Sequence, residues 1–279
     1  MPIDAKTSRA SFDRLRRELT RLAKKPEPQS VHKFRTYSRR VEALLTEVAI
    51  DHHRNDEKLL KLLAKLRQKA GRLRDVDVQL GALRDLKFPQ ANGHKTHLMA
   101  ALVEERRKRE KKLANTFDRA TILELRKRLT RSFKGMKAGK MADPLAITLR
   151  TLTDLARSSG PITEETLHRY RIIGKRARYV AELASDDPEA KKLVEQLKEL
   201  QDVIGDWHDW LKLTQKAERL LGSVRDSALV AMLRNVTQAK FRQSLDAVAE
   251  IRAALAAKTS RSRRTQETEK QASHAAAAA

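Results

Sequence analysis

Apolar residues recur every three or four positions along nearly the whole chain, which is the spacing of amphipathic helices. The alternation of apolar and polar residues that is typical of strands is nearly absent. The pattern therefore predicts an all-α fold. Its expected helices cover about residues 8–24, 30–52, 56–86, 94–118, a shorter stretch to 133, 144–157, 163–185, 188–221, and, as one broken helix or two, 223–258.

Proline, glycine and capping residues mark the expected breaks in the first half of the chain. Pro26 and Pro28 end the first helix, and Ser30 is suited to cap the second. Gly71 lies within the long third helix, where a kink would fall if that helix bends. Residues 88–93, which read Phe-Pro-Gln-Ala-Asn-Gly, have the composition of a loop.

Similar signals recur in the second half. Residues 134–143 contain two glycines, and we interpret them as the connection between two halves. The Ser-Ser-Gly-Pro segment at 158–161 ends one helix, and Thr163 is suited to cap the next. Glu164 and Glu165 are favourable in the first turn of that helix because its N-terminus is electropositive. Asp-Asp-Pro at 186–188 ends it.

A basic motif occurs twice in the chain. Residues 31–35 read Val-His-Lys-Phe-Arg and residues 167–171 read Leu-His-Arg-Tyr-Arg, so that His168 lies 136 residues after His32. A second pair of segments shares Leu, Gly and Asp at an offset of 134. Two motifs in the same order at nearly the same offset predict a duplicated unit. The expected division is a first helical repeat over 1–142, a second over 143–258, and a disordered or frayed tail over 259–279.

Placed on a helix at about 100° per residue, each copy of the motif has a cationic face opposite an apolar one. The first cationic face carries His32, Arg35 and Arg39. The second cationic face carries His168, Arg171, Lys175, Arg178 and Tyr179. Like charges at this spacing repel one another, and they gain most when an anion lies along them.

The overall charge supports a polyanionic partner. The chain carries 60 Lys and Arg against 36 Asp and Glu, a net charge of +24, which destabilises a compact fold by self-repulsion. Nucleic acid, an anionic membrane and an inorganic phosphate polymer are the candidate partners. The chain has no Cys, so disulfides and thiolate metal sites are excluded.

The two motifs resemble those of the CHAD domain, the conserved histidine α-helical domain, over about residues 8–257. The match is close in the second half, through residues 167–179 and the downstream segment that leads to Gly205 and Asp209. The resemblance implies two four-helix-type halves related by pseudo-two-fold symmetry around a central basic channel. It also implies binding of inorganic polyphosphate, with no catalysis and no cofactor.

Carried over residue by residue, the resemblance implies a set of ligand-facing side chains. They are His32, Arg35, Arg39, Arg40, Lys65, Arg72 and Arg74 in the first half, and His168, Arg171, Lys175, Arg176, Arg178, Tyr179, Lys198 and Gln201 in the second. The copies also differ, since Glu42 occupies the place that matches Arg178. We therefore expect unequal halves, with the second binding more tightly. Asp75 and Asp209 have the wrong charge for the ligand, and either orient nearby cations or form ordinary surface ion pairs.

Sequence-independent nucleic-acid binding is the leading alternative, because phosphate contacts supply most non-specific affinity. Single-strand binders use aromatic stacking platforms, however, and the periodicity places the aromatic residues here on apolar faces. We therefore expect nucleic acid to act only as a non-specific competitor.

Metal, enzyme and membrane functions have weaker support. The His52-His53 pair and the His94/His97 pair have no clear carboxylate beside them, and His32 and His168 could converge, yet a metal ion is not expected in a surrounding this basic. The chain has no phosphate-binding glycine loop and no triphosphatase motif. The basic helix from His94 could lie on a membrane, but a surface helix of the bundle is the simpler interpretation.

The location and role that we expect follow from the same features. No apolar leader or membrane-spanning run is present, so a cytoplasmic protein is the default. Targeting to polyphosphate granules fits the expected ligand, as do regulation of polyphosphate metabolism and scaffolding of another protein. The sequence leaves the oligomeric state open.

Overall fold

The computed structural model describes residues 5–51, 53–88, 93–138, 141–157, 160–184 and 186–277, with side chains placed from residue 7 to 136 and from 141 to 256 within these ranges. These residues are helical, apart from loops and one isolated antiparallel bridge between Ala49 and Met141. The prediction of an all-α fold is confirmed. The helices are α1 (Ala5–Lys24), α2 (Pro28–Ala43), α3 (Arg54–Asp85), α4 (His94–Ala114), α5 (Arg119–Ala138), α6 (Pro144–Ala156), α7 (Glu164–Ala181), α8 (Pro188–Leu221) and α9 (Ala228–Ala277).

Several boundaries agree with the sequence signals. Thr163 caps α7, accepting a hydrogen bond from the backbone N–H of Thr166 at 3.2 Å. Asp187 caps α8 through the backbone N–H groups of Glu189 and Ala190. α3 continues without a break through Gly71. Both capping residues accept bonds from N–H groups that a helix cannot satisfy internally, which is why these signals are reliable.

Other boundaries differ from the prediction. Ser30 does not cap α2, which begins with Pro28 after Glu27; the Ser30 hydroxyl is buried inside the first turn and donates to the Glu27 carbonyl at 2.9 Å. The second helix ends at Ala43 and passes into a single π-helical turn, η1 (Leu44–Val48), before the bridge at Ala49. The bridge pulls the chain into an extended conformation, so the helix cannot reach residue 52.

Two further segments are more helical than predicted. α5 continues through Gly135 to Ala138, and part of the expected connection is therefore helix. A Cβ at Gly135 would lie 3.0 Å from the His53 ring, so the glycine allows close packing rather than a turn. α9 is one helix, and its backbone stays helical through residues 259–277, where the sequence predicted a disordered or frayed tail. The predicted loop at 88–93 lies mostly outside the described residues.

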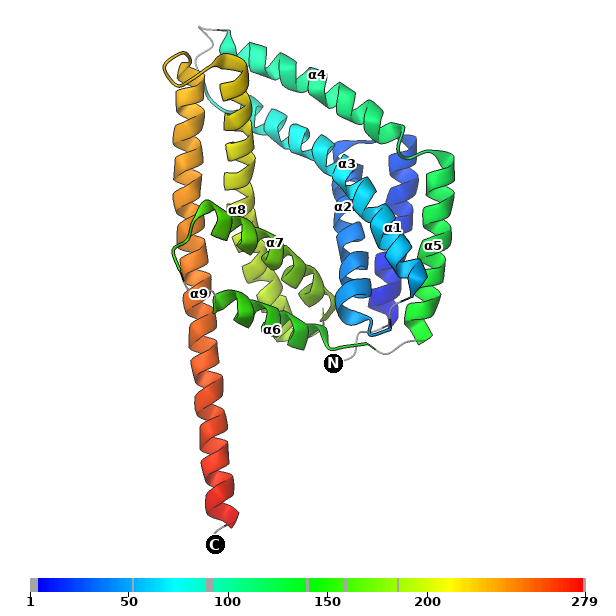
Figure 1. Ribbon diagram of the computed structural model, residues 1–279, viewed down its shortest axis with the longest axis vertical. Coiled ribbons are helices and arrows are strands. Elements are labelled where there is room, and N and C mark those ends of the chain that lie inside the picture. The colour runs from blue at the N-terminus through cyan, green and yellow to red at the C-terminus, as the bar shows by residue number, and fades with distance from the viewer. Residues whose placement is uncertain are drawn as a thin grey trace.

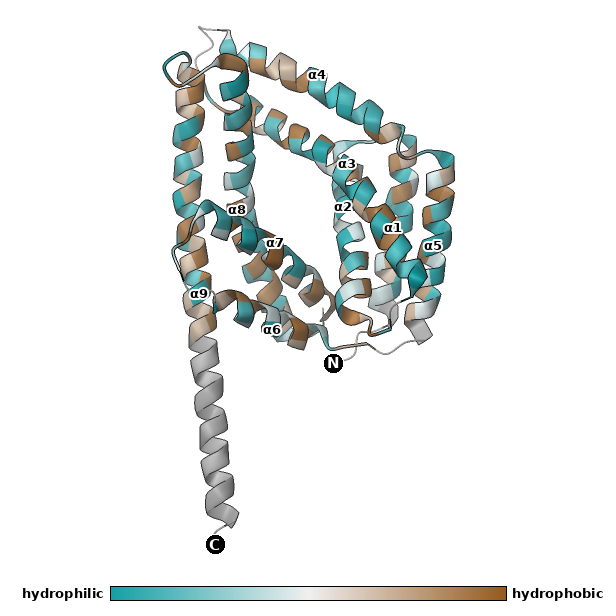
Figure 2. Cartoon of the chain, in the orientation of Figure 1, coloured by the Kyte–Doolittle hydropathy of each residue, from teal (hydrophilic) through white to brown (hydrophobic). Residues whose placement is uncertain are grey.

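The helices of the first and second halves of the chain form two groups. Figure 1 shows α1, α2 and α5 on one side and α6 to α9 on the other, with α3 and α4 running across from the first side towards the upper ends of α8 and α9. In Figure 2 hydrophilic and hydrophobic residues alternate along each helix, as amphipathic packing requires. The two groups meet where α2 packs on α7 and where α3 packs on α8.

The hydrophobic cores tie the two groups together. The core of the first group includes Tyr179 and Val180 from α7, and Leu183 from the following 3-10 turn, η3 (Glu182–Ala184). A second core joins α3 and α4 to α8 and α9, with Leu83 and Leu213 both fully buried in it. Packing of this kind fixes α2 against α7 and so positions the two basic motifs.

Candidate functional site

The two basic helices bring their charges together between the two groups of helices. Arg35 of α2 and Arg171 of α7 lie close enough for each charge to act on the other. Both also act on Asp75 of α3. Lys175 of α7 is influenced by Arg35 and Arg171 and, in the opposite sense, by Asp209 of α8. We call the following residues the central cluster: His32, Arg35, Arg39, Arg74, Asp75, Arg171, Lys175, Arg178, His208 and Asp209.

The cations of the central cluster destabilise one another. The pKa of Lys175 is lowered to about 8, chiefly by burial and then by the charges of Arg171 and Arg35, which outweigh the opposing effect of Asp209. Burial and the neighbouring charges of Arg74 and Arg35 also lower the pKa of His32. The Nε of Arg171 is buried without a hydrogen-bond partner among the described residues. An anion placed here would satisfy free donors and relieve the repulsion.

The carboxylates of the cluster are also held in an unfavourable environment. Burial raises the pKa of Asp209 to about 6; Arg171 opposes the shift and Asp75 adds to it. Burial likewise raises the pKa of Asp75, although Arg35 and Arg171 act against it. Within the described residues neither carboxylate forms a hydrogen bond or ion pair, so the expected direct pairing with nearby cations is not seen. The side chain of Asp75 is exposed to solvent, even though the protein atoms around it raise its pKa.

Gly71 makes room for Arg35. A Cβ built at Gly71 would overlap the Nη1 atom of Arg35 and lie 3.3 Å from its Cζ. The corresponding glycine of the second half, Gly205, has nothing within 4 Å of such a Cβ. The absence of a side chain at Gly71 therefore makes room for an arginine of the cluster. At Gly205 no neighbouring group needs such room.

Gly71→Ala and Gly205→Ala form a matched pair that tests this assignment. Both replacements should favour the helix by up to about 1 kcal/mol. In Gly71→Ala the flexible end of Arg35 must move, so we expect weaker binding of a polyanion without loss of stability. Gly205→Ala should bind as the unchanged protein does. Thermal unfolding and anion titrations measure both effects, and equal binding by the two variants would contradict the role given to Gly71.

One buried contact occurs at equivalent positions in the two halves of the chain. Nε2 of Gln201 donates to the Gly174 carbonyl at 2.9 Å, and Nη1 of Arg67 lies 3.5 Å from the Ser38 carbonyl. Gln201 is only 5% exposed. The structure therefore places Gln201 between α7 and α8 rather than among the ligand-facing residues predicted from the sequence.

Glu42 explains part of the inequality between the halves. It accepts hydrogen bonds from Arg39 at 2.9 Å and from the buried Arg67 at 2.5 Å. Arg178, which occupies the matching place in α7, lies 3.7 Å from Glu182 and stacks over the Tyr179 ring at 4.9 Å. Charge on the first motif is thus neutralised locally by Glu42, which supports the expected inequality. Replacing Glu42 by a cation would leave Arg67 buried without its partner.

The histidines of the two motifs have different neighbours. The ring of His168 lies 6.2 Å from that of His208 in α8, measured between centroids. The pKa of His208 is lowered to about 4, chiefly by burial and then by the charges of Arg171 and Lys212. His32 instead lies near Arg74 and Arg178. His208 was not predicted as a site residue, although it stands at the position that corresponds to Arg74.

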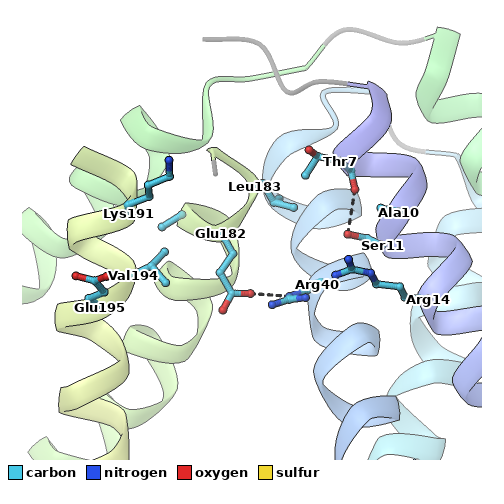
Figure 3. A pocket seen from close by; sticks show the side chains of 11 residues that line it. Thr7, Ala10, Ser11, Arg14, Arg40, Glu182, Leu183, Lys191, Val194 and Glu195 are labelled. Atoms are coloured by element: carbon cyan, nitrogen blue, oxygen red, sulfur yellow. Dashed lines mark hydrogen bonds and ion pairs between the residues drawn. The ribbon is translucent and has the colours of Figure 1, made fainter. Parts of the chain in front are cut away.

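Arg40 lies outside the cluster, in a pocket at the seam between the two groups of helices. Its Nε donates to Glu182 at 2.6 Å across that seam. Figure 3 shows this bond spanning the pocket, which has a volume of about 440 Å³ and is also lined by Arg14 and Lys191. Glu182 contacts both Arg40 and Arg178, so this carboxylate links Arg40 to one arginine of the central cluster.

Four other predicted residues are exposed and are not among the residues of the central cluster. Lys65 and Arg72 lie on α3, and Arg72 stands one helical turn before Asp75 of the cluster. Arg176 is exposed and pairs with Glu47. Lys198 is exposed on the same side of α8 as Asp209, but about 16 Å along the helix axis from it.

Tyr179 stands at the boundary of the cluster and the core. Its side chain is 9% exposed and packs in the core of the first group, while its hydroxyl lies near enough to Arg35 to influence it. It therefore connects the apolar packing to the charges, as its predicted position on the cationic side of α7 suggested.

Among the described residues, no group of three His, Asp or Glu side chains is placed to hold a metal ion. Of the candidate metal ligands, His52 lies outside the described residues, and His94 contacts the Ser227 hydroxyl at 2.9 Å. Within the same part of the chain, no helix is long and apolar enough to cross a membrane.

Comparisons with known proteins agree with the fold. A solved structure described as the CHAD domain from the plant Ricinus communis is similar with a TM-score of 0.67 and 20% identity, covering 91% of this chain and 90% of the other. PptA from Streptomyces chartreusis is similar with a TM-score of 0.63 and 16% identity, covering 91% and 99%. No curated protein sequence matches the chain. The CHAD domain family model matches residues 7–214, and the chain therefore belongs to the CHAD domain family.

Proposed function

We propose that the chain binds inorganic polyphosphate, without catalysing a reaction on it, in a basic channel at the central cluster. The observation that carries this proposal is the convergence of Arg35 from α2 with Arg171 and Lys175 from α7. Burial, followed by repulsion from Arg171 and Arg35, depresses the pKa of Lys175 to about 8, and a chain of phosphates would relieve that repulsion. Family membership supports the same ligand.

We further propose that the binding channel lies between two tandem repeats, residues 1–142 and 143–258, related by pseudo-two-fold symmetry. The equivalent contacts of Arg67 with Ser38 and of Gln201 with Gly174 support this relation. Their offsets of 134 and 136 residues are those of the sequence motifs. Residues 259–279 would take no part in the repeats.

A bare phosphate polymer fits the central cluster better than nucleic acid does. Three large aromatic residues on the helices that carry the cluster are buried in cores, where they cannot stack on bases: Phe34 and Tyr170 are fully buried, and Trp207 is 3% exposed. Guanidinium and ammonium groups are suited to phosphate oxygens, which every unit of polyphosphate presents. Nucleic acid would then compete through its backbone alone.

A cytoplasmic protein that binds polyphosphate would accumulate at polyphosphate granules, and we propose that location for this chain. The role there could be storage or scaffolding, both of which need binding without turnover.

Competition at physiological salt tests the choice of ligand. A fluorescent long-chain polyphosphate is bound to the protein, and duplex DNA, single-stranded RNA or unlabelled polyphosphate is added at equal phosphate concentration. We expect unlabelled polyphosphate to displace the label at least about tenfold more effectively than either nucleic acid, because only it fits between the two basic helices. Equal displacement by DNA would contradict the proposal.

A further inference from the structure

The positive charge of the chain is concentrated in its first half, outside the central cluster as well as within it. Residues 1–142 contain 37 of the 60 Lys and Arg but 17 of the 36 Asp and Glu. The helices α1 and α5, which pack on each other, together carry 14 basic and 3 acidic side chains. In Figure 1, α5 lies at the edge of the molecule away from α8 and α9.

A shallow groove between α1 and α5 collects part of this charge. It has a volume of about 410 Å³ and is lined by Arg16, Arg17, Thr20, Arg126 and Thr130. Nη2 of Arg16 donates to the Thr130 hydroxyl at 2.8 Å, and Nη2 of Arg126 donates to the Thr20 hydroxyl at 2.6 Å. Each arginine thus reaches a threonine of the other helix, and the reciprocal bonds hold both guanidiniums along the groove.

The arginines of this α1–α5 groove are poorly neutralised. Asp13 lies 3.3 Å from Arg16, but within the described residues neither Arg17 nor Arg126 forms an ion pair. A hydroxyl partner leaves the guanidinium charge in place and most of its five N–H donors unused.

Basic side chains on α4 are placed differently. Arg106 donates to Asp77 at 2.8 Å, and Arg109 lies 3.2 Å from Glu105. Part of the charge on that helix is therefore offset by carboxylates, whereas among the arginines of the groove only Arg16 forms an ion pair within the described residues.

We propose that the α1–α5 groove is a second binding surface for inorganic polyphosphate, so that one long chain can contact the protein at two places. This inference rests on the function proposed above. Bare phosphate is favoured over nucleic acid because the aromatic residues of α1 and α5, Phe12 and Phe133, pack on each other with centroids 5.5 Å apart and do not line the groove. Phe12 is 1% exposed, and the polar lining of arginine and threonine offers hydrogen bonds to phosphate oxygens.

A second surface has a consequence that depends on chain length. A chain held in the central cluster brings its free segments to the groove at high effective concentration, which raises the affinity for long chains. A chain too short to leave the cluster gains nothing. Long chains would also be able to bridge two protein molecules.

The test compares two triple variants that each remove three positive charges from the first half. The groove variant is R16Q/R17Q/R126Q, and the α4 variant is R107Q/K111Q/K112Q, whose three positions are exposed. Affinities for tripolyphosphate and for long-chain polyphosphate are measured with the full chain. We expect the groove variant to keep its tripolyphosphate affinity and to lose about tenfold or more for long chains, while the α4 variant loses less than about threefold.

Equal losses for long chains in the two variants would overturn the inference, because they would reflect total charge alone. So would a groove variant that loses duplex DNA binding and keeps its long-chain polyphosphate affinity, since the groove would then belong to nucleic acid. A different result would contradict the proposed function itself. That result is undiminished tripolyphosphate binding in R35Q/R171Q, a variant of the central cluster.

Discussion

Replacing Arg35 and Arg171 together by glutamine is expected to weaken polyphosphate binding by about 100-fold or more. Each arginine contributes charge-assisted hydrogen bonds to phosphate oxygens, and losing such a bond costs about 1.5–3 kcal/mol. The two residues come from α2 and α7 and act on each other, so the double variant would remove one contact from each side of the proposed channel. Glutamine retains polar character and reduces the repulsion among the remaining cations. Titration with fluorescent polyphosphate measures the loss.

The matched control is R107Q/K111Q, which also removes two positive charges but from exposed positions of α4 outside the central cluster. It should weaken binding by no more than about threefold, an effect of the overall field that salt screens. Circular dichroism should show unchanged helical content in both variants. If both lose affinity equally, attraction is diffuse and the central cluster is not the site.

Affinity for polyphosphate is expected to fall about tenfold per pH unit above pH 8. The pKa of Lys175 is about 8 in the free protein, chiefly because of burial and then Arg171 and Arg35, and a bound anion would raise it. The complex therefore holds a proton that the free protein has lost above pH 8, and binding weakens as pH rises. Lys175→Arg should remove this dependence, because arginine stays charged throughout. If the affinity of that variant still falls above pH 8, the pH dependence belongs to another group.

The same linkage predicts a second change at lower pH. The pKa of Asp209 is about 6, raised by burial and by Asp75 against the opposing Arg171, and a bound polyanion would raise it further. Binding then takes up a proton as pH falls from about 7 through 6, and affinity rises. Asp209→Asn should bind more tightly at pH 7 and show no rise below it. The interior phosphates of a long chain stay ionised over this pH range, so the change in affinity comes from the protein.

The sequence predicted the helices and the two basic faces well, because both depend on residue spacing along one helix. His32, Arg35 and Arg39 share a face of α2, as do Arg171, Lys175 and Arg178 on α7, and packing of α2 on α7 brings the two sets together. The spacing could not show which other residues reach the same place. That depends on how α3 and α8 are rotated against these helices.

Arg40 and Gln201 illustrate what residue spacing in the sequence cannot predict. Both stand beside motif residues in the sequence, but Arg40 turns to Glu182 at the seam, and Gln201 binds the Gly174 carbonyl inside the second group. Conversely His208 reaches Arg171 and His168, which no local pattern indicates. Each outcome is decided by a contact between residues far apart in the chain.

The central claim is tested most directly by a crystal structure of the full chain with bound short-chain polyphosphate. The account predicts one ordered chain between α2 and α7, with phosphate oxygens within hydrogen-bonding distance of both Arg35 and Arg171 and with Lys175 beside it. Phosphates ordered only on the outer α1–α5 groove or at other surfaces, with none between α2 and α7, would contradict it.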